Sequence, residues 1–390
     1  MNNMVPPRRV LHVAAGNLFG GVETFLVTLA KYRATVPQLV SEFALCFEGR
    51  LADALLEHGA KVHWLGNARL TAPLTIARAN LALARILEKN QYSAVIVHGA
   101  WPHVLVGAQV KLRGKRLVTW AHGAPLEVGL LDRVANRIRP DLMIVNSHHT
   151  RVALGQLFQG VPSRLVYYPV EPHQSNRSRA DVRNELKTSE GALVIAFAGR
   201  FERWKGHDLL LRAAKALLHR SAGDWCIWMC GGVQRDSEKQ YYAELRGYVK
   251  SHRLEARVQF LGPRTDVPDV LRAADIFCQP NTGPEPFGIV FIEALYAGLP
   301  VVATNMGGAA EIVSQECGIL TEPTPTAVAD ALFRLLSDAG ARRSLGSLAW
   351  QRANELCEPT ARIMQIAEAV AGLEMPSGQP QATSFPETKP

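Results

Sequence analysis

Acidic side chains stand where the sequence is otherwise apolar or rich in glycine. In the stretch PEPFGIVFIEALYAGLPVVATNMGGAAEIV, which begins at residue 284, the acids are Glu285, Glu293 and Glu311. The segment 288–297 predicts a helix that contains Glu293, with Glu285 outside it in a turn rich in proline. Carboxylates in such positions can accept hydrogen bonds from the hydroxyls of a sugar or a ribose. Glu311 also fits a structural role, as an acceptor for nearby backbone N–H groups.

The start of this helix is a predicted anion site. The N–H groups of Phe287, Gly288 and Ile289 precede the first closed turn, and the helix dipole adds a partial positive charge there. Glu285 and Glu293 are separated by a length comparable to that of a nucleoside diphosphate. The pattern predicts a pyrophosphate at the helix start, with one carboxylate on a sugar and the other on a ribose. A Glu near a helix start also stabilises the helix without any ligand, so both explanations stay open.

Two cations follow the first strand predicted in the second half of the chain. In AGRFERWKGHDLLLRA, Arg200 stands at the end of that strand and Lys205 stands five residues later, near the next helix. Cations at a strand end suit a pyrophosphate, whose negative charge grows when it departs as a leaving group. A salt-bridged surface pair is the alternative explanation for these two residues alone.

A glycine loop near the N-terminus is a second predicted phosphate contact. In HVAAGNLFGGVETFLVTLAK a predicted strand leads through Gly20 and Gly21 into a helix that begins near Val22. Glycines let the backbone approach a ligand, and the free N–H groups of the helix start favour an anion. A tight strand-to-helix turn without a ligand is the alternative. The spacing differs from the dinucleotide pattern G-x-G-x-x-G, which disfavours a dehydrogenase.

Histidines end two of the predicted strands in the first half. His122 in TWAHGAP and His98 in VIVHGA each precede a glycine. Because strand ends line the ligand site of such sheets, we expect His122 to contact a sugar hydroxyl or to shield an oxocarbenium-like centre. His98, His148 and His149 are expected to be packing or surface residues.

Short apolar runs rich in β-branched residues alternate with helical segments along the chain. This is the pattern of parallel strands buried between crossover helices. Residues 75–89 are predicted as one such helix, with Leu81 and Leu83 on its apolar face. The polar segment 171–191 interrupts the alternation and is predicted as a linker. The expected fold class is α/β, with two tandem Rossmann-like doubly wound domains and a ligand cleft between them.

Composition excludes several classes of protein. The 390 residues are 47% hydrophobic and 20% charged, as in an ordinary soluble globular protein, and no apolar run approaches the roughly 18 residues of a membrane span. The run from Val10 to Ala15 is shorter than the apolar region of a secretory signal and contains His12, so it is predicted as the first strand. The scattered cysteines, without Cys-x-x-Cys spacing, predict buried thiols of a reducing cytoplasm and no metal site.

Charge is unevenly distributed. Residues 1–172 have 19 Lys and Arg against 10 Asp and Glu, whereas residues 173–390 have 24 against 25. The basic first half predicts an anionic partner, either a lipid headgroup surface or a phosphorylated acceptor. The surface of an ordinary basic protein is the alternative. Nucleic acid is not expected, because the cations are interspersed and no recognition module occurs.

Taken together, four segments resemble a known family. GGVETFLVTLA, GRFERWKG, EPFGIVFIEALYAGLPVVATNMGGAAEIV and GIL occur in the order found in the retaining, nucleotide-sugar-dependent glycosyltransferase family 4, of the two-domain GT-B architecture. The resemblance implies that Arg200 and Lys205 hold the donor diphosphate. It implies further that Glu285 binds the transferred sugar and Glu293 the donor ribose.

The resemblance also implies roles for the first half. Gly20 and Gly21 would form the loop facing the donor phosphate and the acceptor, and His122 would contact the sugar. The expected domains are an acceptor-side domain at residues 1–172 and a nucleotide-sugar domain at residues 173–358. A final helix at residues 359–374 would cross back to the first domain, and residues 375–390, rich in Pro, Ser and Thr, are expected to be disordered.

The reaction expected from this resemblance is hexosyl transfer to an acceptor hydroxyl with retention, in the synthesis of an envelope polysaccharide or a glycolipid. A same-face route, in which the leaving phosphate deprotonates the acceptor, is favoured because no nucleophile is evident in the first half. The cations and amides stabilise the leaving group and no Asp-x-Asp occurs, so no metal or other cofactor is required. The expected location is the cytoplasm, with peripheral attachment to the inner face of the cell membrane. A non-hydrolysing sugar-nucleotide epimerase and a non-catalytic GT-B binding protein are the alternatives.

Overall fold

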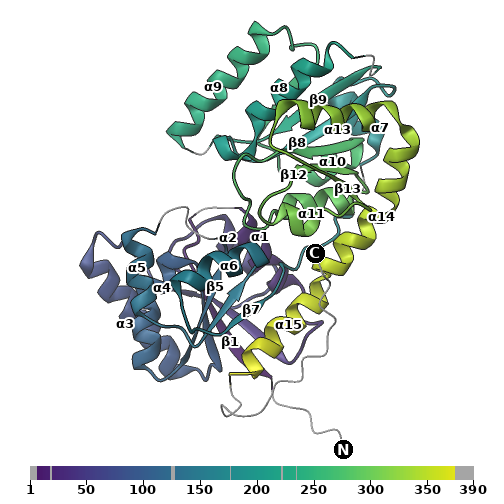
Figure 1. Cartoon of the computed structure of the whole chain (residues 1–390). Helices are drawn as coiled ribbons and strands as arrows, with labels where there is room; N and C mark the ends of the chain where they lie inside the picture. The colour runs from purple at the N-terminus through teal and green to yellow at the C-terminus, as the bar shows by residue number, and fades with distance from the viewer. Residues whose placement is uncertain are drawn as a thin grey trace, which may run out of the picture. The chain divides into compact units, whose positions relative to one another are not determined.

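The chain folds into two compact α/β units. The structure, a computed structural model, describes residues 7–17, 20–123, 128–175, 177–220, 223–233 and 235–373 (Figure 1). Unit 1 comprises Met1–Glu171 and Cys357–Pro390, and unit 2 comprises Pro172–Leu356. Each unit is a parallel sheet with helices packed on it, which confirms the predicted fold class. The predicted disordered tail, residues 375–390, lies outside the described residues.

Unit 1 is built on a parallel sheet with the strand order β3-β2-β1-β4-β5-β6-β7. The strands are β1 (Arg8–Ala14), β2 (Leu39–Leu45), β3 (Val62–Trp64), β4 (Ala94–His98), β5 (Arg116–Ala121), β6 (Leu142–Val145) and β7 (Ser163–Leu165). The helices are α1 (Gly21–Lys31), α2 (Arg50–Glu57), α3 (Pro73–Lys89), α4 (Ala100–Leu112), α5 (Leu130–Arg137), α6 (His148–Leu157) and α15 (Pro359–Ala371). The last of these, α15, packs against α1 and β1 of the same unit.

Unit 2 repeats the arrangement, with the strand order β10-β9-β8-β11-β12-β13. The strands are β8 (Leu193–Ala198), β9 (Trp225–Cys230), β10 (Val258–Gly262), β11 (Ile276–Gln279), β12 (Val301–Thr304) and β13 (Gly318–Thr321). The helices are α7 (Arg179–Glu185), α8 (His207–Leu217), α9 (Asp236–Ser251), α10 (Val267–Ala273), α11 (Ile289–Tyr296), α12 (Ala309–Ile312), α13 (Pro325–Ser337) and α14 (Ala339–Cys357). In each sheet the strand order reverses once, between β1 and β4 and between β8 and β11. Ligands of doubly wound folds bind at the carboxyl ends of strands beside such a switch point.

Helix α3 forms where it was predicted, and Leu83 of the predicted apolar face is buried, but Leu81 is not. Ala79, Leu83, Ala84 and Leu87 are buried, whereas Leu81 is 53% exposed. The placement of Leu81 on the apolar face was therefore wrong. Ala79 and Ala84 complete the buried face of the helix. The prediction missed them because it considered only large apolar residues.

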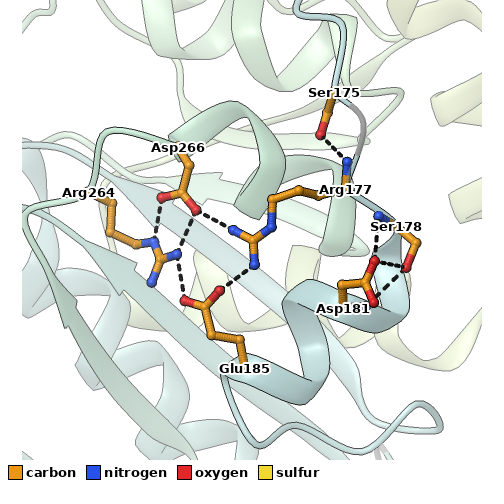
Figure 2. A network of polar contacts seen from close by, with 7 residues as sticks. All are labelled: Ser175, Arg177, Ser178, Asp181, Glu185, Arg264 and Asp266. Atoms are coloured by element: carbon orange, nitrogen blue, oxygen red, sulfur yellow. Dashed lines mark hydrogen bonds and ion pairs between the residues drawn. The ribbon is translucent and has the colours of Figure 1, made fainter.

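The linker predicted at residues 171–191 was also wrong, because this segment contains α7 and an ion-pair network (Figure 2). Arg177 donates to Asp266 over 2.7 Å and pairs with Glu185. Arg264 bridges the same two carboxylates, at 2.6 Å from Asp266 and 2.8 Å from Glu185. Holding the cations against these carboxylates lowers the pKa of Asp266 and of Glu185. The polar composition thus belongs to side chains that pair with one another, not to a chain running free in solvent.

The six cysteines are buried and free, which confirms the prediction of buried thiols. In the described part of the chain, none of the helices combines the length and the apolar character needed to cross a bilayer.

Arg183, in the middle of α7, gives a prediction about stability. Its guanidinium is fully buried, donates to the backbone carbonyls of Ala273, Ser189, Glu190 and Ala192 at 2.9–3.0 Å, and contacts Asp275 at 2.7 Å. Replacing it in Arg183→Met leaves those acceptors unpaired, so we expect a loss of about 3–5 kcal/mol in the free energy of unfolding. Urea denaturation followed by circular dichroism measures the loss.

The matched control is Arg179→Met in the same helix. Arg179 also contacts Asp275, at 2.7 Å, but its side chain is 43% exposed. We expect this change to cost less than about 1 kcal/mol. Equal effects of the two substitutions would contradict the assigned role of Arg183.

Candidate functional site

Lys205 and Glu285 meet at the switch point of unit 2. After β8 the chain forms a single 3-10 turn, Arg203–Lys205, and then turns at Gly206 into α8. Gly206 has a φ of +82°, and a Cβ there would lie 1.8 Å from the carbonyl oxygen of Pro280, after β11. Glycine is therefore required for the β8 loop to pack against the β11 loop. This packing places the ammonium of Lys205 on the carboxylate of Glu285.

The carboxylate of Glu285 also accepts hydrogen bonds from two amide side chains. Glu285 is 7% exposed, and its Oε2 accepts from Lys205 Nζ, from Asn281 Nδ2 at 3.3 Å and from Gln279 Nε2 at 3.5 Å. The Lys205 ammonium lies 4.2 Å from the centre of the Trp204 ring. Among the described residues, Oε1 of Glu285 has no hydrogen-bond partner. One oxygen is thus fixed by the protein and the other is free to accept from a ligand hydroxyl.

The turn before α11 places backbone donors beside this carboxylate. Gly288, with a φ of +98°, precedes the first residue of the helix. Within the described chain the N–H groups of Gly288 and Ile289 have no acceptor, as expected at a helix start. Phe287 is buried, so its ring fixes the turn in the core. The predicted helix start is therefore present, and within the described chain the N–H groups of Gly288 and Ile289 are its free donors.

Gly307 and Gly308 pack against the backbone of this turn. A Cβ at Gly307 would lie 2.4 Å from the carbonyl oxygen of Glu285, and one at Gly308 would lie 2.5 Å from that of Phe287. The N–H of Gly308 donates to the Glu285 carbonyl over 2.6 Å. The protein's own backbone thus closely approaches both glycines, and this packing holds Glu285 in place.

Glu293 is the second acid of the segment and lies inside α11, half-buried. Its carboxylate has no hydrogen-bond or ion-pair partner among the described residues. Desolvation raises the pKa of Glu293 to about 7. Burying a carboxyl group without a partner lowers the stability of the fold. Such a group, with a raised pKa, is therefore a candidate for a functional site.

Arg200, predicted to hold a diphosphate together with Lys205, has partners of its own. Its guanidinium lies 3.0 Å from Glu202 and 3.7 Å from Glu238. The two cations therefore approach different carboxylates, although both follow β8. Their joint action on one phosphate group stays a prediction.

The residues predicted in unit 1 are at the ends of its strands. Gly20 caps α1, and its N–H already donates to Glu23 over 2.9 Å, whereas the N–H of Gly21 has no acceptor in the described chain. Both ring nitrogens of His122 are also engaged, with His98 at 3.0 Å and with the hydroxyl of Tyr168 at 2.5 Å. Burial lowers the pKa of His122 to about 3. A ligand contact through a ring nitrogen of His122 therefore requires one of these partners to be displaced.

Several residues of the site were not found from the sequence. Gln279 and Asn281, which support Glu285, follow the apolar strand β11 in DIFCQPN, and polar residues at the end of a buried strand were an available signal. Tyr168 gave no such signal, because it comes close to His122 only in the folded chain.

Comparison with known proteins places this chain in a family. Residues 19–174 match the family model described as Glycosyltransferase Family 4, and residues 178–352 match the model described as Glycosyl transferases group 1. The two models together cover nearly all of both units, in the two-domain GT-B class that the paired Rossmann-like sheets define. The chain belongs to glycosyltransferase family 4, which confirms the resemblance seen in the sequence.

Curated relatives match only a part of the chain. A D-inositol 3-phosphate glycosyltransferase of Salinispora tropica is 39% identical over 183 residues, which is 45% of this chain and 38% of that protein. A protein of the same name from Corynebacterium glutamicum is 32% identical over 232 residues, which is 55% of this chain and 53% of that protein. This chain thus aligns with about half of the relatives' length or less.

Solved structures match the whole fold. The Anabaena protein Alr3699/HepE, crystallised in complex with UDP and glucose, has a TM-score of 0.82 and 24% identity, with 94% of this chain and 100% of that chain covered. A glycosyltransferase of Rickettsia africae has a TM-score of 0.81 and 19% identity, with coverages of 94% and 99%. At these identities the likeness establishes the fold.

The raised pKa of Glu293 predicts an unusual pH dependence of stability. In the folded state Glu293 keeps its proton up to a pH of about 7, whereas the ordinary pKa of a glutamate is 4.5. Between these two pH values, folding is therefore accompanied by uptake of a proton by Glu293. Stability is therefore lost as the pH rises from 4.5 to 7, and the loss persists above 7. We expect Glu293→Gln to stabilise the protein by about 1–2 kcal/mol at pH 8, after allowance for partial exposure, and to have no effect at pH 4.5.

Urea denaturation of wild type and variant at both pH values measures this difference. Glu316→Gln is the control, because Glu316 is exposed. A stabilisation by Glu293→Gln that is equal at pH 4.5 and pH 8 would exclude titration of Glu293 as its cause.

Proposed function

We propose that this protein is a retaining glycosyltransferase that moves a hexosyl group from a nucleoside diphosphate sugar to an acceptor hydroxyl. One observation supports this proposal above the others: the ion pair of Lys205 and Glu285 lies beside the free amides of Gly288 and Ile289, at the switch point of the unit 2 sheet. A cation, helix-start donors and a carboxylate with one free oxygen are the groups that a diphosphate joined to a sugar needs. Its Anabaena neighbour was crystallised with UDP-glucose, so a uridine donor is the first to test.

In this proposal the donor inserts between groups that are already charged. Lys205 keeps two of its three N–H donors free while it holds Glu285, and these with the α11 amides bind the diphosphate. The free Oε1 of Glu285 accepts from hydroxyls of the transferred sugar. Glu293 accepts from the ribose, a bond that favours its ionised form and would lower its raised pKa. Arg200 contributes if its guanidinium moves from Glu202 to the phosphate.

The chemistry proposed is stabilisation of a leaving group. As the bond from the anomeric carbon to the phosphate oxygen lengthens, the electron pair passes to the diphosphate, where Lys205 and the amides stabilise the new charge. The acceptor hydroxyl attacks from the same face, and its proton goes to the departing phosphate oxygen. These groups serve without a metal in the proposal.

A donor screen tests the proposal. We expect one nucleoside diphosphate sugar, with UDP-glucose as the first candidate, to raise the unfolding free energy by about 2.7 kcal/mol at 100 times its dissociation constant. Lys205→Ala should lower the transfer rate by about 10²–10³-fold, because it removes a charge that faces the leaving group. Lys215→Ala, in which an exposed lysine of α8 is lost, is the control and should leave the rate unchanged. Thermal shift and nucleotide release measure the two effects.

The alternatives give other results in the same experiment. Stereochemical change of the sugar without any acceptor would indicate an epimerase. Donor binding without transfer to any soluble or membrane-extracted acceptor would indicate a GT-B binding protein.

For the acceptor, we propose an anionic or lipid-linked hydroxyl compound of envelope polysaccharide or glycolipid synthesis, used at the inner face of the cell membrane. The basic first half supports an anionic partner, and two curated relatives act, by name, on D-inositol 3-phosphate. Helix α3 offers a surface for a bilayer. Leu74 and Leu81 are 76% and 53% exposed, and Arg78 and Arg85 are exposed on the same helix face.

Vesicle co-sedimentation tests membrane docking through α3. Wild type should bind vesicles that contain anionic lipid and dissociate as salt increases, because each cation near such a surface contributes about 1 kcal/mol. Exchanging two cations for two anions in Arg78→Glu/Arg85→Glu should weaken binding by at least about tenfold. Lys250→Glu/Arg343→Glu, which changes the net charge by the same amount at exposed positions of α9 and α14, is the control. Binding that ignores both salt and anionic lipid would remove this part of the proposal.

A further inference from the structure

Three histidines form a continuous hydrogen-bonded row across the unit 1 sheet. His12 on β1, His98 at the end of β4 and His122 after β5 are linked by contacts of 3.0 Å between ring nitrogens, from His12 Nδ1 to His98 Nε2 and from His98 Nδ1 to His122 Nε2. We name these residues the histidine row. It crosses the switch point between β1 and β4, where the strand order of the sheet reverses.

The ends of the row are hydroxyl groups. Ser41 Oγ on β2 lies 3.3 Å from His12 Nε2, and the hydroxyl of Tyr168 lies 2.5 Å from His122 Nδ1. Four contacts thus need four hydrogens. Three neutral imidazoles supply three of them and one terminal hydroxyl supplies the fourth. The row is complete when every ring is neutral.

Asn146 indicates the direction of the row. Its Nδ2 donates to the backbone carbonyl of His122 and to the hydroxyl oxygen of Tyr168, both at 3.1 Å. A carbonyl only accepts, so the contact with His122 fixes which end of the amide faces Tyr168. The tyrosine oxygen accepts from Asn146, and the order of the row is set when its hydrogen is directed to His122 Nδ1, 2.5 Å away. Each histidine then carries its hydrogen on Nε2, and the last of these donates to Ser41.

The surroundings of the row oppose a positive charge. His12 and His98 are 0% and 6% exposed, and the row is stacked against aromatic rings, with Phe43 at 5.4 Å from His12 and Trp120 at 5.9 Å from His98. No carboxylate among the described residues bonds to these rings. An added proton would also require Tyr168 to turn its hydrogen away from His122 while Asn146 still donates to the same oxygen. Burial accordingly lowers the pKa of His12 to about 3.

We propose that His12, His98 and Tyr168 are positioning residues that hold His122 as a neutral imidazole in the Nε2–H form. This inference rests on the proposed function together with the contact between His122 and the transferred sugar that the family resemblance implies. As the bond to the diphosphate lengthens, positive charge develops at the anomeric carbon. An imidazolium beside that carbon would repel the charge, whereas a neutral ring does not. The row thereby removes the one charge change that a histidine undergoes between pH 5 and 8.

Nitrogen-15 NMR of histidine-labelled protein tests the row without a ligand. The chemical shifts distinguish the two neutral tautomers and the imidazolium, and single His→Gln variants assign the signals. We expect His12, His98 and His122 to be Nε2–H and to stay neutral from pH 8 down to pH 5. Titration of any of the three near pH 6.5, or an Nδ1–H form at His122, would overturn the proposal. This result does not depend on whether the protein transfers a sugar.

Two substitutions of His98 separate positioning from mere packing. His98→Glu places a carboxylate beside His122, and we expect the ring to become protonated near neutral pH. Release of UDP from UDP-glucose in the presence of acceptor should then fall at least tenfold between pH 8 and pH 6, while wild type stays within twofold. His98→Gln keeps a neutral hydrogen-bonding group, so any loss of rate should be the same at every pH.

The outcomes distinguish the two proposals. A pH-independent loss in both variants means that His98 only packs, and this contradicts the inference. If wild type transfers no sugar from any donor, the proposed function fails, while the NMR titration still decides the state of the row. Circular dichroism at each pH confirms that the variants are folded before their rates are compared.

Discussion

The attraction between Lys205 and Glu285 is the interaction on which the site in unit 2 depends. It joins the loop after β8 to the loop after β11, two segments that only the fold brings together. Nearly buried charges lose much of their hydration, so such a pair is favourable only where further hydrogen bonds support it. Gln279 and Asn281 provide them on the carboxylate side. Glycines provide the room, because a side chain at position 206, 307 or 308 would collide with backbone atoms of the facing loop.

Pairing the cation in advance has a consequence for a phosphate ligand. In the proposed function the ammonium of Lys205 is positioned before the diphosphate binds, because Glu285 and the ring of Trp204 already hold it in one place. The free-energy cost of desolvating Lys205 and of restricting its side chain therefore arises during folding and does not weaken binding. Arg200 lies between Glu202 and Glu238 in a similar way but is more exposed, at 38% of its side chain. Of the two cations, Lys205 is therefore the better ordered.

The fold was predictable because its signal is local. Apolar runs such as LVIAFA and VVAT are buried on both faces and stand out without knowledge of their neighbours. The helix start at Gly288 was readable for the same reason. What failed depends on partners distant in sequence: Arg177 looked like part of a solvated linker because Asp266 is 89 residues away. His98 was expected only to pack, since nothing in VIVHGA indicates that its ring nitrogens meet His12 and His122.

The two units place charge according to opposite needs. In the proposed function, Lys205, Arg200 and the amides before α11 of unit 2 bind the diphosphate as it gains negative charge, and each cation is paired with a carboxylate. In unit 1, His12, His98 and His122 form a row whose contacts are complete when every ring is neutral, and burial among aromatic rings opposes a further proton. A reaction that separates charge needs both properties, because cations stabilise the leaving group and the same cations near the sugar would oppose its departure. Under the proposed function, the sorting of charged and neutral side chains between the two sheets suits the charge separation of glycosyl transfer, and it follows from which residue types end which strands.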